Sequence, residues 1–338
     1  MIGFKTLLLG SLLCALTIWP ASSNAQNADW ESWKAGLKKE VIAKGIKPEF
    51  ANRVIGGLSY DSNVVSKDSN QVSSKYSFAE YKKKAVNPNR VQNGRDYYRK
   101  HKQELDMFAA REGVPAEVIV ALLGIETDYG GYLGDYDVLR SVASIAYGSK
   151  RKTTKAQQAR RKYFRVQTFH ALKLLQDGVI QRQDFKGSWA GAFGINQHMP
   201  ESFYSYVVDG DNDGDKEIMN KNDLSDVFAT TANHLKKVRW KTGERWGRKV
   251  KLPANFSKAL IGNKIKKPIA FWNSNGVTQM NGQPLPVVAG MQGSIIAPDG
   301  VNGEVYIGYE NFHAFRRWNK SDYFALVVGN LSDRIAQR

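Results

Sequence analysis

The chain has 338 residues, of which 42% are apolar, and its 49 Lys and Arg outnumber its 32 Asp and Glu by 17. This length and apolar content permit one large domain or two of ordinary size and exclude a disordered chain. The only cysteine is Cys14, which excludes an internal disulfide framework, a zinc ribbon and a redox pair of cysteines. The excess of positive charge indicates an anionic partner, which is nucleic acid, a lipid surface or an acidic polymer.

Residues 1–25 have the layout of a secretory signal peptide. Lys5 precedes an apolar run from Leu7 to Trp19, and small residues follow Pro20 up to Ala25. We therefore expect cleavage after Ala25 and export of a mature chain that begins at Gln26.

The alternative for this segment is a lipoprotein anchored through Cys14. It fits less well, because Leu13 stands where a small residue should precede a lipidated cysteine, and Cys14 lies inside the apolar run. No later apolar stretch approaches the roughly 20 residues that a membrane helix needs. The mature chain is therefore expected to have no transmembrane segment and to be soluble in an exported compartment.

Apolar periodicity predicts a mainly helical chain before Trp246. Helices are expected over residues 30–58, 92–112 and 115–126, with further helices up to about residue 177, and a long surface loop is expected over residues 59–77. After Trp246, short apolar runs alternate with turn residues and predict a small β subdomain with strands over residues 249–252, 269–272, 287–289, 294–297 and 304–309. A closing helix is expected from about Lys320.

Glu126 is the first candidate for chemistry. Ile119, Leu122 and Leu123 lie seven, four and three positions before it, which places the carboxyl group on the apolar face of its helix. Burial there raises a carboxyl pKa, and a carboxylic acid that stays protonated near neutral pH can protonate a glycosidic oxygen. The alternative is a glutamate at a helix end whose carboxylate reaches water.

Residues 187–200, with the sequence GSWAGAFGINQHMP, contain three glycines among aromatic and amide side chains. Such a segment permits close approach of backbone to a ligand, and Ser188, Asn196 and Gln197 offer hydrogen bonds to sugar hydroxyl or acetamido groups. A tightly packed turn without a ligand is the alternative.

Together with GIETDYG at residues 124–130, this segment resembles the signature of the lytic murein transglycosylase B family, lysozyme-like enzymes that cleave peptidoglycan. The resemblance runs from about Tyr81 to Arg338. It includes VQNG at 91–94, GVP at 113–115, DGDNDG at 209–214, AN at 232–233, NF at 311–312 and NKS at 319–321.

The resemblance implies an α+β fold that is mainly α, with a lysozyme-like helical core and a small β subdomain. It implies five segments: a signal peptide (1–25), an N-terminal helical segment and loop (26–77), a catalytic core with a calcium-binding loop (78–248), the β subdomain (249–312) and a C-terminal helix packed on the core (313–338). It also implies a periplasmic location in a Gram-negative envelope, with membrane association left open.

The family cleaves the bond between N-acetylmuramic acid and N-acetylglucosamine without water, forming 1,6-anhydromuramic acid. The resemblance makes Glu126 the catalytic acid that later acts as base, and it places Tyr81, Ser188, Gln197 and Asn319 around the substrate. Arg160 is a weaker match. The sequence departs from the family's pattern in four places, with His198 for Phe, His234 and Trp318 for Tyr, and Met219 for Trp, and these departures leave subsite preference open.

No second carboxylate stands in a matching motif, which fits a mechanism in which the acetamido group of the substrate stabilises the reacting centre and its C6 hydroxyl attacks. Asp128, Asp135 and Glu201 are the candidates for a second acid if that mechanism is wrong.

Asp209, Asp211 and Asp213 alternate before Gly214, with Asp215 following, as at the start of an EF-hand-like calcium loop. The twelfth position of the loop is Asn220 instead of the usual bidentate glutamate. Asp226, or less well Asp223, must then close the site, and the ion is expected to be structural Ca²⁺. A solvated acidic turn without a metal is the alternative. No organic cofactor is expected.

A basic cluster between Lys150 and Arg165 contains no acid and has aromatic neighbours, a pattern that can bind nucleic acid. A solvated helix face is the simpler interpretation. In an exported protein the natural polyanion is the wall itself, whose peptides carry carboxylates, so peptidoglycan strands and not nucleic acid are the expected partner. The five histidines show no tight metal spacing and are given no ligand role.

Three functions follow from these observations. The first is a lytic transglycosylase, the second is a hydrolase (muramidase) of the same bond, and the third is a noncatalytic, calcium-stabilised wall-binding protein. An intact motif around Glu126 argues against the third, and the chemical form of the product separates the first two.

Overall fold

The structure is a computed structural model that describes residues 21–70, 76–148 and 154–337. Most of the expected signal peptide, together with Cys14, lies outside these residues. The chain divides into two compact units, one ending at Gly57 and the other beginning at Leu58. No helix within the described residues is long and apolar enough to cross a bilayer.

The first unit is a pair of helices, α1 (Ala21–Ala43) and α2 (Pro48–Gly56), which pack on each other. Pro48 is the first residue of α2, where its missing N–H costs nothing and its fixed φ suits a helix. Trp30 and Trp33 of α1 stack with their ring centroids 5.0 Å apart, and Trp30 is buried.

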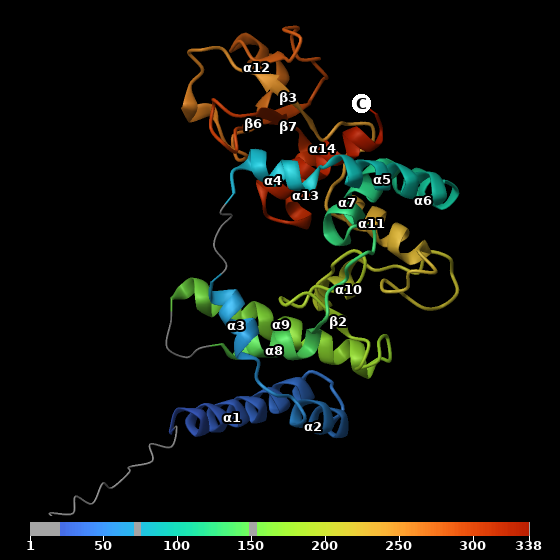
Figure 1. Cartoon of the computed structure of the whole chain (residues 1–338), viewed down its shortest axis with the longest axis vertical. Coiled ribbons are helices and arrows are strands. Elements are labelled where there is room, and N and C mark those ends of the chain that lie inside the picture. Colours follow the sequence, from blue (N-terminus) through green and yellow to red (C-terminus); the bar gives the residue numbers. More distant parts are fainter. Residues whose placement is uncertain (1–20, 71–75, 149–153, 338) are drawn as a thin grey trace, which may run out of the picture. The chain divides into compact units, whose positions relative to one another are not determined.

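The second unit contains the remaining elements, most of which Figure 1 labels along the chain. Its helices are α3 (Ser62–Ser69), α4 (Phe78–Ala85), α5 (Pro88–Lys100), α6 (Lys102–Glu112), α7 (Ala116–Thr127), α8 (Val138–Tyr147), α9 (Lys155–Gln176), α10 (Pro200–Tyr206), α11 (Ser225–Lys237), α12 (Ile269–Ser274), α13 (Glu310–Trp318), α14 (Asp322–Ile335) and the short 3-10 helix η1 (Lys258–Leu260). Its strands are β1 (Tyr136–Asp137), β2 (Lys186–Gly187), β3 (Gly247–Lys251), β4 (Lys267–Pro268), β5 (Thr278–Gln279), β6 (Gln292–Ile296) and β7 (Val305–Gly308).

Helix α7 is the centre of the helical core. It packs against α5, α6, α11 and α14, and it is buried along almost its whole length. The helix begins after its N-cap Pro115 and ends at Asp128, whose φ of 52° terminates it. This arrangement holds the last turn of α7, which contains Glu126, in a rigid environment.

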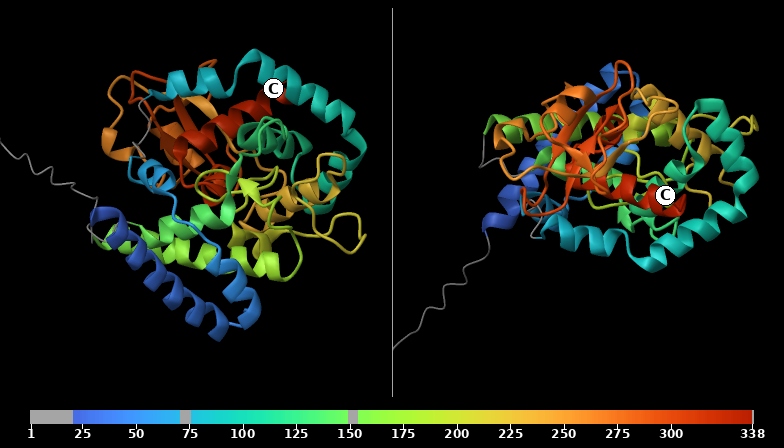
Figure 2. Two further views of the ribbon diagram at one scale, coloured as in Figure 1. Left: turned by 60° about the horizontal axis from the view of Figure 1, so that its bottom comes forward. Right: turned by 90° about the horizontal axis from the view of Figure 1, so that it is seen from above.

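The β subdomain is a five-stranded antiparallel sheet with strand order β4-β6-β7-β3-β5. Ile295 pairs with Ile307 and Val250 with Val305, and these side chains form a small separate core with the buried Trp272. Figures 1 and 2 show this sheet in orange and dark orange, with the red helices α13 and α14 of the core beside it. The expected fold class, mainly α with a small β subdomain, is confirmed.

The helical part differs from expectation in two places. The predicted loop over residues 59–77 contains α3, because the Asp61 carboxylate accepts hydrogen bonds from the backbone N–H groups of Asn63 and Val64, and Val64 is fully buried. The predicted helix over residues 92–112 is two helices, α5 and α6, which are separated at His101.

The β subdomain also differs from expectation in its elements. Ile269–Trp272, predicted as a strand, lies in α12, and residues 287–289 form no strand. Trp272 is fully buried and donates its indole N–H to the carbonyl of Gly293 at 3.0 Å. Only Ile269 and Trp272 of this run are buried, and Ala270 is exposed. Four apolar residues are too few for their periodicity to separate a helix from a strand, which explains the error.

Candidate active site

Glu126 lies in the last turn of α7 and is only partly exposed. Burial raises the pKa of its carboxyl group from 4.5 to about 7, because removal of water disfavours the charged form. The Trp318 indole N–H donates a hydrogen bond of 2.8 Å to Oε1 of Glu126, which lowers the pKa and partly offsets the effect of burial. The site thus contains a carboxyl group that exchanges its proton near neutral pH.

Trp318 belongs to a cluster of aromatic rings. Its indole stacks on the His234 ring, with centroids 4.2 Å apart and planes 20° apart, and the other face of His234 stacks on Tyr206 at 3.6 Å. His198 meets His234 edge to face, and His198 Nε2 lies 3.1 Å from His234 Nδ1. Three of the four positions at which the sequence departs from the family's pattern therefore contact one another, beside Glu126.

Tyr81 lies on α4 near the same carboxyl group. Burial raises the pKa of its phenol, the negative charge of Glu126 raises it further, and Arg90 acts in the opposite direction. The Tyr81 ring packs at 5.8 Å from that of Tyr323 on α14. The phenol is thus neutral at any physiological pH and is able to donate a hydrogen bond.

The glycine-rich segment is fixed to the end of α7. Thr127 Oγ1, next in sequence to Glu126, donates to the Ile195 carbonyl at 3.0 Å and accepts from the Gly130 N–H at 3.1 Å. Gly194 has a φ of +76°, and a Cβ atom there would stand 2.7 Å from the Ile218 carbonyl oxygen. Only glycine fits this position without a shift of backbone.

Two candidate substrate residues lie on this segment. Ser188 Oγ accepts from the Ala192 N–H at 3.0 Å, which leaves its hydroxyl hydrogen to donate. Gln197 Nε2 donates to the carbonyls of Leu133 and Gly194, so Oε1 is the atom able to accept from a hydroxyl group. Both residues are partly exposed.

Asn196, which the sequence also suggested as a sugar ligand, is completely buried. Its Nδ2 donates to the Val227 carbonyl and to Thr231 Oγ1 on α11, so it fixes the segment to that helix and does not reach a ligand. Asn319 is exposed and directly follows Trp318, and its Oδ1 accepts from the Ser321 N–H at 3.2 Å.

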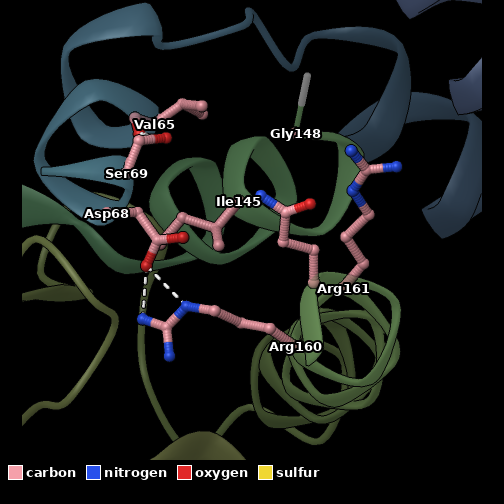
Figure 3. A pocket seen from close by; sticks show the side chains of 8 residues that line it. Val65, Asp68, Ser69, Ile145, Gly148, Arg160 and Arg161 are labelled. Atoms are coloured by element: carbon pink, nitrogen blue, oxygen red, sulfur yellow. Dashed lines mark hydrogen bonds and ion pairs between the residues drawn. The ribbon is translucent and has the colours of Figure 1, made fainter. Parts of the chain in front are cut away.

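Arg160, the weaker match, lies in a different environment. Its Nε donates to Oδ1 of Asp68 at 2.7 Å, which joins α9 to α3, and both residues line a pocket of about 200 Å³ (Figure 3). The other predicted substrate residues, Tyr81, Ser188, Gln197 and Asn319, do not line this pocket.

Three of the five predicted metal ligands come together. Oxygen atoms of Asp209, Asp211 and Asp226 all lie within 4.8 Å of one another. Burial raises the pKa of Asp226, the backbone N–H groups of Gly210 and Glu217 act in the opposite direction, and the charges of Asp211 and Asp209 raise it again. Asp213 and Asp215 lie on the same loop but outside this group. Asp215 stands at the seventh loop position, which in an EF-hand offers its backbone carbonyl.

A helical core with a small antiparallel sheet, and a partly buried carboxyl group at the end of the central helix, give this chain a lysozyme-like fold. The sequence matches the model of the transglycosylase SLT domain over residues 29–333. The chain belongs to this family.

The similar proteins agree with that assignment. The membrane-bound lytic murein transglycosylase B of Escherichia coli (strain K12) is 29% identical over 259 residues, which are 76% of this chain and 66% of the relative. This chain thus spans slightly less than two thirds of that protein.

Solved structures extend the comparison. SltB3 from Pseudomonas aeruginosa, in complex with NAG-NAM-pentapeptide, is 34% identical with a TM-score of 0.83. The match covers 91% of this chain and 80% of the SltB3 chain. The Escherichia coli lytic transglycosylase Slt35, in complex with calcium, is 25% identical with a TM-score of 0.77, over 90% and 92% of the two chains.

The sequence did not reveal the contact between Trp318 and Glu126 or the pairing of the two histidines. Glu126 and Trp318 are 192 residues apart, and no spacing rule relates them. The only available signal was that Trp318, His234 and His198 each depart from the family's pattern.

Replacement of Glu126 by Gln should make the protein more stable at pH 8 and leave its stability unchanged at pH 4. The folded-state pKa of about 7 lies above the unfolded value of 4.5, so the carboxyl group favours folding only while it is protonated. The neutral amide avoids burial of a carboxylate, which costs about 2 to 3 kcal/mol at pH 8 when partial exposure to water is allowed for.

Denaturant unfolding of both proteins between pH 4 and pH 9 measures this difference. The difference in free energy of unfolding between variant and wild type should grow as the pH rises above 4.5 and level off above 7. A difference that stays constant across this range would mean that Glu126 has an ordinary pKa.

Proposed function

We propose that this protein is a lytic transglycosylase that cleaves the β-1,4 bond between N-acetylmuramic acid and N-acetylglucosamine and leaves 1,6-anhydromuramic acid. The observation that carries the proposal is the half-buried Glu126, whose carboxyl group is protonated up to about pH 7 and has a hydrogen-bond donor on one oxygen only. Membership of the transglycosylase family and the solved SltB3 complexes with peptidoglycan fragments support it.

Glu126 acts first as acid and then as base in this mechanism. The indole of Trp318 can only donate, so Oε1 is the oxygen without a proton and Oε2 carries the proton that passes to the departing glycosidic oxygen. The resulting carboxylate then accepts the proton of the muramic acid C6 hydroxyl as that oxygen attacks C1. The second step regenerates the acid, and no water is consumed.

The absence of a second catalytic acid favours this mechanism over hydrolysis by a carboxylate pair. Among the described residues, no other acid contributes to the pKa of Glu126. Asp128 is exposed and bonded to Arg90 at 3.0 Å, and Glu201 accepts from Gln167 Nε2 at 2.8 Å. The acetamido group of the substrate therefore stabilises the positive charge that develops at C1.

Tyr81, Ser188, Gln197 and Asn319 hold the sugar around Glu126 in this proposal. Each keeps a polar group available beyond its contacts within the protein, and two of them lie on the rigid segment that Thr127 fixes to α7. Their role is to position the bond, while the proton is transferred by Glu126 alone.

The Glu126→Gln variant should lose a factor of about 10² to 10⁴ in rate on isolated wall, because the amide has no proton to transfer. Ser188→Ala and Gln197→Ala should lose less, since they weaken positioning only. Mass analysis of the wild-type digest should find fragments that end in 1,6-anhydromuramic acid, one water lighter than hydrolysis products.

Two results would contradict the proposal. Reducing-end muramic acid as the main product would establish a muramidase, and a folded wild-type protein that binds wall without cutting it would establish a noncatalytic binder. Circular dichroism of each variant separates loss of chemistry from loss of fold.

We further propose that the loop of residues 209–226 binds one structural Ca²⁺. Asp209, Asp211 and Asp226 supply carboxylate oxygens from three directions, and Asp213 and Asp215 complete the set as the loop closes on the ion. The calcium complex of Slt35 supports the choice of ion. The site lies where α11 begins, so the ion fixes the start of that helix.

The melting temperature should therefore be higher with Ca²⁺ than with a chelator, because an ion that binds only the folded state stabilises it. Asp211→Asn should remove most of this difference, while Asp135→Asn, which changes an exposed acid outside the loop, should keep it. Calorimetric melting of the three proteins in both conditions is the measurement. Equal melting temperatures of the wild type in both would leave the loop as a solvated acidic turn.

We also propose that the protein is exported to the periplasm, where its wall substrate lies, and that residues 1–25 are removed. The order of charged, apolar and small residues supports this. N-terminal sequencing of protein from the envelope should begin at Gln26. A lipid-modified terminus at Cys14 would instead place the protein on a membrane.

Residues 78–248 form the catalytic core in this proposal and residues 249–312 the β subdomain. Residues 313–338, which contain most of α13 and all of α14, close the core. The separate apolar cores of the helical and β parts, and the packing of α14 on α7, support these boundaries. Residues 26–77 are the N-terminal helical segment.

A further inference from the structure

His234 is held between two aromatic rings beside the catalytic carboxyl group. Tyr206 covers one face at 3.6 Å with planes 9° apart, and Trp318 covers the other at 4.2 Å with planes 20° apart. His234 is 6% exposed and His198 is 3% exposed. The orientation of the Trp318 indole is therefore set by the ring on which it lies.

We propose that His198 and His234 are positioning residues, which as a hydrogen-bonded, uncharged pair hold the Trp318 indole on Oε1 of Glu126. The inference rests on the proposed function, because it assigns the orientation of the acid in that reaction. His198 Nε2 and His234 Nδ1 are 3.1 Å apart, so one ring donates and the other accepts. This bond prevents His234 from turning about its χ2 angle within the stack.

The pair stays uncharged between pH 5 and pH 7, where Glu126 is protonated. Burial lowers the pKa of His198 to about 4. Burial, followed by the neighbouring His198 and by the positive charge of Lys237 on α11, lowers the pKa of His234 to about 2. The other groups that face the pair are Tyr206 at the end of α10 and Trp318 at the end of α13, neither of which carries a charge.

Because the histidine pair is uncharged, it does not favour the carboxylate form of Glu126. An imidazolium beside Glu126 would favour its carboxylate form and reduce the fraction of protonated acid between pH 5 and pH 7. Two histidines in water would be partly protonated in that range, since an ordinary histidine pKa is about 6.5. The buried pair supplies rigid polar rings without this charge.

The orientation of Trp318 determines which oxygen of Glu126 carries the proton. While the indole donates to Oε1, the proton resides on Oε2. Without that contact, the carboxyl group rotates and the proton occupies either oxygen. Only a fraction of the protein molecules then has the proton on the oxygen that faces the substrate. The same contact lowers the pKa of Glu126, so its loss raises that pKa.

The test compares three variants with the wild type. Trp318→Phe removes the donor and keeps most of the packing. The double variant His198→Phe with His234→Phe removes both partners of the bond between His198 Nε2 and His234 Nδ1, so neither is left unpaired, and it keeps the aromatic stack. His313→Phe is the matched control, because His313 is another buried histidine of low pKa, on the same helix as Trp318.

The first readout needs no activity. The pH dependence of unfolding, compared in each background with and without Glu126→Gln, reports the pKa of Glu126. Trp318→Phe should raise it by about one pH unit, the size expected for loss of a hydrogen bond to a charged group. The double variant should raise it by a smaller amount in the same direction, and His313→Phe should leave it unchanged.

The second readout is the rate on isolated wall as a function of pH. The alkaline limb of kcat/KM should move upward as the pKa does, and kcat should fall about tenfold or more with little change in KM, because a misplaced catalytic group costs rate and not binding. If the double variant does not fold, His198→Phe alone provides the same comparison, since it removes the partner of His234 Nδ1.

A folded double variant with the pKa of Glu126, the kcat and the pH profile of the wild type would overturn the inference and leave the histidines as packing residues. Hydrolysis products or no products from the wild type would overturn the proposed function, while the unfolding readout would still decide the role of the pair. The two failures are thus distinguishable.

Discussion

The site depends on one constraint: a carboxyl group must be buried enough to keep its proton near pH 7 and open enough to give that proton away. Helix α7 meets the first requirement, because neighbouring helices cover almost all of it up to its last turn. Its termination at Asp128 meets the second, because Glu126 then lies where the chain leaves the core. Trp318 adds a donor on one oxygen, which limits the rise of the pKa and leaves the other oxygen for the substrate.

Helix α11 links this carboxyl group to the acidic loop. Asp226 stands in its first turn and accepts from the backbone N–H groups of Gly210 and Glu217, while His234 lies eight residues later, roughly 12 Å along the helix. Between these two positions, the Val227 carbonyl and Thr231 Oγ1 accept hydrogen bonds from Nδ2 of the buried Asn196. Asn196 directly precedes Gln197 and His198 in the chain. A cation that fixes the start of α11 therefore also steadies the ring on which Trp318 rests and the segment that carries Gln197.

The sequence predicted those features that depend on neighbours in the chain. The position of Glu126 follows from apolar residues within two turns, and the acidic loop follows from a spacing of two. The pairing of His198 with His234, and of Trp318 with Glu126, depends on contacts between residues 36 and 192 positions apart, which local periodicity does not encode. The strand predicted at Ile269–Trp272 failed for a different reason, because a run of four apolar residues is too short to show whether its period is that of a helix or of a strand.

The net charge of the chain and the groups around Glu126 bear on two different steps of the proposed reaction. The first is attraction of the substrate, and the second is transfer of the proton. The chain has a formal charge of +17, and long-range attraction of this kind acts on a polyanionic wall and weakens as salt screens it. Close to the carboxyl group, Trp318 and the rings stacked behind it, those of His234, His198 and Tyr206, carry no charge between pH 5 and pH 7, where Glu126 is protonated. A cation placed there would strengthen binding of an anion and also drive the proton off the acid. Uncharged imidazole and indole rings keep hydrogen-bonding capacity at the site and avoid that conflict. Positive charge elsewhere on the chain can then attract an anionic ligand without changing the pKa of Glu126.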